Sequence, residues 1–214
     1  MPEPSEILLS TEDDPTPLVR AVRADLTRRL DDPEFAELTR AARGTAAIRD
    51  ASTPEAVTAT VGGGTVTLVH GVDPGAQVVA VVGGGGGHEA DLPESAAAEH
   101  PALTAWLAAL LAPSSDWAAA AERFWAALEP RPGAPQALLV VELEGGERRR
   151  FGADGRAYEI HGRAEDLTAL LEGRTALIAE AFERRILIRG SFGEISVLSG
   201  AAFDVRMGAP EADG

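Results

Sequence analysis

Two amphipathic helices are predicted near the start of the chain from the spacing of their apolar residues. In TPLVRAVRADLTRRL, residues 16–30, Thr16 can cap a helix that Pro17 begins, and Leu18, Val22, Leu26 and Leu30 fall on one stripe. The segment DDPEFAELTRAARG repeats this arrangement, with Asp32 as the cap and Gly44 as the stop. Both helices therefore present one apolar face to a core.

The pattern then changes to the short apolar runs that are typical of β-strands. TAAIRD, EAVTATV, TVTLVHG and AQVVAVV follow one another between residues 45 and 82, and the later ones are separated by GGG and DPG. These runs predict a small antiparallel meander. The glycine-rich segment 83–101 after it has the composition of a flexible loop.

Helices and strands follow again in the second half of the chain. One helix is predicted over PALTAWLAALLA, which Pro101 begins, and another over DWAAAAERFWAALE, with Ser114 or Ser115 as its cap. After the linker PRPGAP at 130–135, strands are predicted in QALLVVELEGG, ERRRFGADG and RAYEIHG. Residues 164–191 then form a helix, a glycine stop, a second helix and a strand, and SFGEISVLSGAAFDVRM is ambiguous between helix and strand.

This order predicts a disordered acidic tail over 1–15, a first α/β half over 16–130, a second half over 131–207 and a loose tail over 208–214. The two halves are weakly similar, because 54–71 resembles 135–152 and 102–124 resembles 165–184. One interpretation is an internal duplication. The other is chance similarity between segments that are rich in Ala and Gly.

Several helices and strands are apolar on the faces that would meet. In the final helix–helix–strand segment, apolar residues recur at helical spacing and then on alternate strand positions, and all the tryptophans lie in the two helices before the linker. Such faces form either a packed core or the wall of a ligand pocket. The residues concerned are Trp106, Leu110, Trp117, Phe124, Leu167, Leu170, Leu171, Leu177, Ile178, Phe182, Ile186 and Ile188.

The run YEIHGRAEDLTALLEGRTALIAEAFERRILIRGS resembles the C-terminal half of the sterol carrier protein type 2 family. That family shows an "edL..ll.G" helix, a second helix with an aromatic residue near its end and a "kl.i.G" strand. The matching residues here are Glu165, Asp166, Leu167, Leu170, Leu171, Gly173, Phe182, Ile186, Ile188 and Gly190. The resemblance is best over 136–200, and a degenerate tandem copy would lie over 34–128. The chain departs from the family where Gly-Lys positions read Glu-Arg-Arg.

The resemblance implies an α+β fold in which helices cover one face of an antiparallel sheet, or two fused sterol-carrier-like halves of this kind. It further implies a cavity between sheet and helices that takes a fatty acyl chain, a sterol or another apolar molecule such as a polyprenoid. The twelve apolar residues given above would line it. The family has no catalytic machinery of its own, so we expect no enzymatic activity.

Composition narrows the partners. The formal net charge of −15 argues against nucleic acid and against tight binding to anionic membranes. No apolar run reaches the roughly 18 residues of a membrane span. The start of the chain lacks a secretory pattern and cysteine is absent, so we expect a cytoplasmic protein. The absence of lysine is typical of a GC-rich genome, which suggests a bacterial source.

Candidate chemistry is sparse. The loop HEADLPESAAAEH holds His, Asp and Glu without a metal-ligand spacing, so neither a metal nor another cofactor is predicted. His161, with Glu159 and Asp166, could form an acid/base pair in an apolar pocket. The arginines of helix 17–30 suggest a protein-docking surface.

These observations support three functions. The first is a soluble lipid-binding protein of the sterol carrier type. The second is a non-catalytic interaction or scaffold domain whose core is filled. The third is an enzyme that acts on a hydrophobic substrate, with His161 as its acid/base residue.

Overall fold

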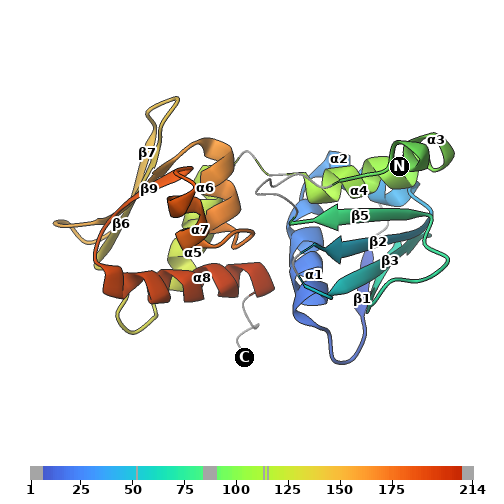
Figure 1. The fold of residues 1–214 in the computed structure, drawn as a ribbon, viewed down its shortest axis with the longest axis horizontal. Helices are drawn as coiled ribbons and strands as arrows, with labels where there is room; N and C mark the ends of the chain where they lie inside the picture. The colour runs from blue at the N-terminus through green and yellow to red at the C-terminus, as the bar shows by residue number, and fades with distance from the viewer. Residues whose placement is uncertain (1–6, 52, 84–90, 113, 115, 209–214) are drawn as a thin grey trace, which may run out of the picture. The chain divides into compact units, whose positions relative to one another are not determined.

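The protein divides into two compact units, Met1–Ala112 and Pro113–Gly214, in a computed structural model (Figure 1). The structure describes residues 7–51, 53–83, 91–112, 114 and 116–208. Each unit is a mixed β-sheet with helices packed on one face, which confirms the predicted α+β class. The boundary between the units lies after Ala112, and the boundary predicted at 130/131 is therefore wrong. The helix expected at the end of the first half belongs to the second unit, because its apolar side chains are part of that unit's core.

The first unit has a five-stranded sheet in the order β1-β4-β3-β2-β5. The predicted antiparallel meander is present as β2, β3 and β4, but β1 pairs parallel with β4, and β5 pairs parallel with β2. The prediction of a purely antiparallel sheet is therefore wrong. The elements are β1 (Leu8–Thr11), α1 (Pro17–Arg29), α2 (Pro33–Ala41), β2 (Gly44–Asp50), β3 (Ala56–Gly62), β4 (Thr65–His70), β5 (Val78–Val82), α3 (Glu94–Glu99) and α4 (Pro101–Leu111).

The chain crosses the sheet between β4 and β5, and this crossing makes β5 parallel. The Thr58 hydroxyl donates to the Gly71 carbonyl oxygen at 2.7 Å and accepts from the Asp73 backbone N–H at 2.9 Å. These hydrogen bonds hold the connection between β4 and β5 against β3, and β5 then pairs with the free edge of β2. Hydropathy along the chain does not report such a crossing, because it depends on a contact between distant residues.

Part of the predicted disordered tail is ordered. Leu8–Thr11 forms β1, and Ile7 and Leu9 pack against the core of the first unit. The Ser10 and Thr67 hydroxyls hydrogen bond at 2.9 Å across the β1–β4 pair. Residues 1–6 and 209–214 of the two predicted tails lie outside the described residues. The predicted loop 83–101 contains α3, while its residues 84–90 are also outside.

Helix caps follow the sequence signals only in part. The Asp32 carboxylate accepts from the Glu34 N–H at 2.9 Å, as predicted. Thr16 occupies the cap position of α1, but its buried hydroxyl has no hydrogen-bond partner among the described residues. The helix at 117–128 is capped by Asp116, which accepts from Ala119 N–H at 2.9 Å, and not by Ser114. A carboxylate is the stronger acceptor for the free N–H groups of a first helical turn.

The second unit has a four-stranded sheet in the order β7-β6-β8-β9. β6 pairs antiparallel with β7 and parallel with β8, and β8 pairs antiparallel with β9. The segment that was ambiguous between helix and strand is helical. The elements are α5 (Trp117–Leu128), β6 (Ala137–Glu142), β7 (Arg148–Gly152), β8 (Tyr158–Gly162), α6 (Ala164–Leu171), α7 (Leu177–Phe182), β9 (Ile186–Arg189), the 3₁₀ turn η1 (Phe192–Glu194) and α8 (Ile195–Met207).

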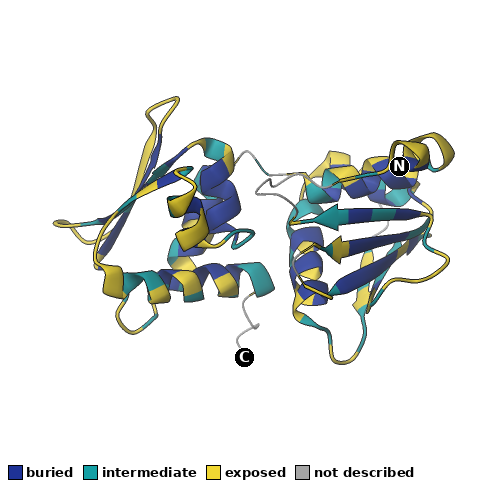
Figure 2. Cartoon of the chain, viewed as in Figure 1, coloured by how far each residue is buried: buried dark blue, intermediate teal, exposed yellow. Residues whose placement is uncertain are grey.

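Each unit has its own hydrophobic core between its sheet and its helices (Figure 2). In the first unit α1, α2 and α4 cover the sheet. In the second α5, α6 and α7 contact the sheet, and α8 packs against α5 and α6. The Trp125 and Phe151 rings stack at 6.1 Å, joining α5 to β7. None of the helices in the described part of the chain has both the length and the apolar character that crossing a membrane requires.

The two sheets share a three-strand arrangement. In each, one strand pairs antiparallel with the next strand of the chain and parallel with a later one, namely β2 with β3 and β5, and β6 with β7 and β8. By this arrangement β2 and β3 correspond to β6 and β7. The sequence similarity between 54–71 and 135–152 instead matches β3 and β4 with β6 and β7, so it does not follow the topology. The matched segment 102–124 also spans the boundary between the units.

Candidate functional site

The open face of the second sheet, opposite the helices, contains a cleft of about 500 Å³. This volume lies in the range of small-molecule sites, roughly 300–1,000 Å³. Its apolar residues come from β6 and the turn after it, and its ionisable residues come from all four strands or their connections. The lining residues are Leu139, Val141, Glu142, Leu143, Gly146, Arg148, Glu159, His161 and Arg189.

Strand pairing places these side chains together. Residues opposite one another in a sheet lie on the same face, and alternate residues of a strand share that face. Leu139 lies opposite Glu159, which lies opposite Arg189. Val141 lies between Arg148 and His161 in the next row. The cleft is therefore a direct consequence of the register of β7, β6, β8 and β9.

His161 and Glu159 form the closest polar pair in the cleft. The His161 Nε2–H donates to Glu159 Oε2 at 2.9 Å, and the two side chains are 16% and 28% exposed. Because they are two residues apart on β8, both point to the open face. Arg189 Nη1 lies 3.9 Å from the same Glu159 oxygen. The carboxylate therefore fixes the histidine ring and partly balances one guanidinium.

The other carboxylates at the cleft are also engaged by the protein. The buried Glu142 accepts hydrogen bonds from the backbone N–H groups of Glu144, at 2.7 Å, and Gly145. The Glu144 carboxylate pairs with Arg163 at 3.4 Å. These contacts hold the β6–β7 turn and leave little free acceptor capacity at this end of the cleft.

The two guanidiniums that line the cleft are less committed. Within the part of the chain that the structure describes, the Arg148 guanidinium makes no hydrogen bond or ion pair. The Arg189 guanidinium makes one ionic contact there, with Glu159. By contrast Arg149, on the same strand but facing the other side, pairs with Glu147 at 3.1 Å. Arg150 donates to the Ala153 and Gly155 carbonyl oxygens at 2.8 and 2.9 Å.

The residues predicted to line a lipid cavity do not form one set. Trp106 and Leu110 are in the first core, and the others belong to the second unit. Most are fully packed, with Leu167, Leu171 and Trp106 at 0% exposure. A hollow large enough for a ligand would leave accessible surface on the side chains around it. At these positions the space between sheet and helices is filled by protein.

Three of the predicted residues differ from this pattern. Ile178 and Phe182 on α7 are 45% and 83% exposed, so the apolar face predicted for that helix is turned partly to solvent. Ile188 is half-buried, while Leu187 is exposed on the opposite side of β9. The predicted division of this strand into an inner and an outer side is therefore confirmed.

The predicted acid/base group is brought together only in part. His161 and Glu159 meet in the cleft, but Asp166 is buried on α6. The charge of Asp166 contributes to raising the pKa of Arg185, whose main cause is the side-chain hydrogen bond from Arg185 to Glu180. Arg185 and the buried Glu180 form a two-pronged pair at 2.6 and 2.9 Å. Asp166 therefore belongs to a structural ion cluster with Arg185 and Glu180.

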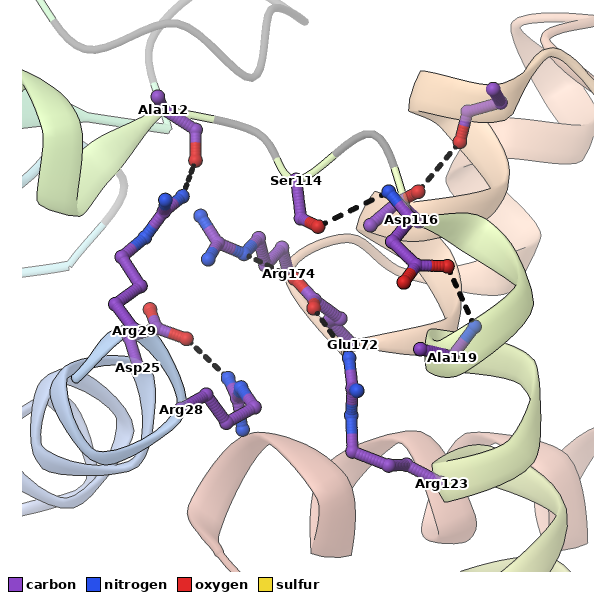
Figure 3. A network of polar contacts seen from close by, with 12 residues as sticks. Asp25, Arg28, Arg29, Ala112, Ser114, Asp116, Ala119, Arg123, Glu172 and Arg174 are labelled. Carbon is purple, nitrogen blue, oxygen red and sulfur yellow. Dashed lines mark hydrogen bonds and ion pairs between the residues drawn. The ribbon is translucent and has the colours of Figure 1, made fainter. Parts of the chain in front are cut away.

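The buried carboxylate of Glu172 has a structural role at the end of α6 (Figure 3). Glu172 is 3% exposed and accepts from Arg123 at 2.9 Å and from Arg174 at 3.0 Å. Arg123 lies on α5, so the ion pair joins α5 to the turn that follows α6. Burial of a paired carboxylate of this kind fixes geometry and does not point to a ligand.

The arginines of α1 are mostly used within the first unit. Arg20 donates to the Pro15 carbonyl oxygen at 3.0 Å, Arg28 pairs with Asp25, and Arg29 donates to the Ala112 carbonyl oxygen (Figure 3). Arg23, the other arginine of this helix, is exposed and its side chain makes no hydrogen bond or ion pair with another described residue, so the partner-docking role of helix 17–30 stays a prediction. A groove of about 630 Å³ runs along the neighbouring α2, lined by Pro33, Glu34, Glu37, Leu38 and Ala41.

No group of three or more metal-ligating side chains occurs among the described residues, which exclude residues 84–90 of the histidine-containing loop. Sequence inspection missed Leu139, Val141, Arg148 and Arg189 as site residues. The apolar run ALLVVE was a signal, because a strand that is apolar on both sides has an apolar outer face.

Comparisons of this chain with family models, with curated proteins and with solved structures found no match. The chemistry of the chain's own residues therefore carries the functional conclusion.

Proposed function

We propose that this protein is a non-catalytic binding protein for a small amphipathic molecule, which lies in the cleft on the open face of the second sheet. The observation that carries the proposal is the composition of that cleft. An apolar floor of Leu139, Val141 and Leu143 is bordered by the ionisable side chains of Arg148, His161 and Arg189. Ligand sites commonly combine an apolar surface with a few polar groups that fix orientation.

The resemblance to the sterol carrier family supports an apolar ligand. We also propose that each unit, with helices on one face of its sheet, is arranged like a sterol carrier protein. The packing of Leu167, Leu170 and Leu171 favours a different location from the one that the family would use. A ligand between sheet and helices would have to displace these side chains. A ligand on the open face buries Leu143, which is 57% exposed, without that cost.

Native mass spectrometry of the purified protein, followed by organic extraction, tests whether a small molecule co-purifies. In parallel, binding of 1-octanol is measured by chemical-shift changes of backbone amides. We expect shifts at β6, β8 and β9, and we expect Leu143→Gln to weaken binding several-fold, since a buried methylene contributes about 0.8 kcal/mol. Leu8→Gln is the matched control, because Leu8 is 62% exposed on the other unit.

Octanol shifts that map to α5, α6 and β9 core residues would instead place the ligand between sheet and helices. Binding that is unchanged by Leu143→Gln would exclude the cleft.

The hydrogen bond between His161 and Glu159 favours a second candidate, an enzyme that uses His161 as a general base. A carboxylate that orients a histidine in a cleft is a recurring arrangement in catalysis. Hydrolysis of 4-nitrophenyl octanoate tests it. Turnover that His161→Gln abolishes would establish this activity, whereas binding without turnover supports the non-catalytic proposal.

A further inference from the structure

We infer that the ligand of the cleft carries an anionic group, a carboxylate or a phosphate, which Arg148 and Arg189 bind. This inference rests on the proposed function and names the chemistry of its ligand. The two arginines approach the cleft from opposite sides. Arg148 lies on the edge strand β7 and Arg189 on the edge strand β9. Between them lie β6, which supplies the apolar floor, and β8, which supplies Glu159 and His161.

The balance of hydrogen-bond donors and acceptors supports an anion. Each carboxylate that lines the cleft already has a donor from the protein. Glu142 is held by backbone N–H groups, and Glu159 is held by His161, at 2.9 Å, and approached by Arg189, at 3.9 Å. Arg148 has no acceptor among the described residues. The cleft therefore offers unused donors and few unused acceptors, which is the complement of an anion.

The next two residues of β7 strengthen this contrast. Arg149 faces the other side of the sheet and pairs with Glu147, whereas Arg150 lies on the same face as Arg148 but donates to two carbonyl oxygens. Arg148 is the member of this arginine run that both lines the cleft and lacks such a partner. Charged residues on an edge strand commonly prevent its pairing with another chain. That role alone does not explain this arginine run, since its members differ in what they contact.

The net charge of the whole chain is −15, and it would repel an anion at long range. Screening in physiological salt limits that repulsion to roughly 8 Å. Two guanidiniums at the cleft act inside this distance and can form charge-assisted hydrogen bonds. Selectivity for an anion is therefore a local property of the cleft, and we expect it to be reduced when either guanidinium is removed.

The experiment compares ligands that share one eight-carbon chain and differ in their head group. Affinities of 1-octanol, octanoate, octyl phosphate and octylammonium are measured by calorimetry with the full chain. We expect octanoate or octyl phosphate to bind at least about tenfold more tightly than octanol, because hydrogen bonds to ionised groups are about twice as strong as neutral ones. The tighter of these two anions then identifies the head group.

Substitutions assign the effect to residues. Arg148→Gln and Arg189→Gln should each reduce the affinity for the anions several-fold more than the affinity for octanol. Arg149→Gln is the matched control, because it removes the same charge from the same strand on the opposite face. High salt should weaken binding of the anions and not of octanol.

The outcomes separate the inference from the proposed function. Equal affinities for octanol and octanoate, with both reduced by Leu143→Gln, would leave the binding function intact and overturn the anionic ligand. Tighter binding of octylammonium would also overturn it. If none of the four compounds binds, the proposed function and this inference both fail.

Discussion

Truncation of Leu167 measures whether the space between sheet and helices in the second unit is core or ligand cavity. Leu167 on α6 is 0% exposed, and an added methyl group at Gly162 would meet its Cγ at 3.3 Å. Leu167→Ala removes three buried carbons, a transfer cost of about 2.4 kcal/mol at roughly 0.8 kcal/mol each. The unfilled space raises the expected loss of unfolding free energy to about 3–5 kcal/mol.

Hydrogen–deuterium exchange of β6 and β8 amides across a urea series is the assay, because it reports the unfolding of this unit alone. Leu187→Ala is the control, since Leu187 lies in the same unit and is 53% exposed. We expect it to cost less than about 1 kcal/mol. If Leu167→Ala is as mild as Leu187→Ala, the region around Leu167 is not close-packed. A ligand could then lie between sheet and helices, as the sterol carrier resemblance implies.

Three further substitutions test local features of the second unit. Tyr158→Phe should leave stability at neutral pH unchanged or raise it by up to about 1 kcal/mol, because the buried Tyr158 hydroxyl has no hydrogen-bond partner in the part of the chain that the structure describes. Burial raises the pKa of Tyr158 above 10.0, so the unfolded chain loses this proton at a lower pH than the folded protein does. The free energy of unfolding of the wild type should therefore fall as the pH rises above 10.0. Urea titrations of Tyr158→Phe should lack the part of this fall that Tyr158 causes. Arg123→Ala should cost about 1–3 kcal/mol in the same titrations, since it removes one of the two arginines bound to the buried Glu172, whereas Arg149→Ala, at an exposed pair, should cost less than about 0.5 kcal/mol. Arg184→Gly should raise the thermal midpoint, because Arg184 adopts a φ of 61° that costs a non-glycine residue roughly 1 kcal/mol; an unchanged or lower midpoint would contradict this strain.

The location of the cleft changes how the chain's apolar segments are interpreted. Leu167, Leu170 and Leu171 are apolar because they fill a core, as such stripes commonly do. Leu139 and Val141 are apolar on the other face of the same sheet, where they line the cleft. The second pair is the less expected one, since a solvated sheet face is usually polar. This contrast makes the open face the better candidate for a binding surface.

Much of the secondary structure follows from local patterns in the sequence. The helix that Pro33 begins is capped by Asp32, and α4 begins at Pro101, as the sequence signals predict. Strands β2 to β9 lie at the predicted runs, with β2 beginning one residue early and β3 ending one residue late, because alternation, turn residues and caps act between neighbours in the chain. The predicted cap at Thr16 was wrong, because its hydroxyl makes no hydrogen bond to another described residue although it stands at the cap position.

The sequence by itself determined the α+β class, the approximate position of most elements and the sides of β9. Only the tertiary structure decided the parallel pairing of β2 with β5 and of β6 with β8, the boundary after Ala112 and the position of the cleft. Strand order depends on contacts between segments far apart in the chain, such as Thr58 with the connection after β4. His161 and Arg189 share a surface for the same reason, because the register of β8 with β9 brings together residues that no local pattern connects.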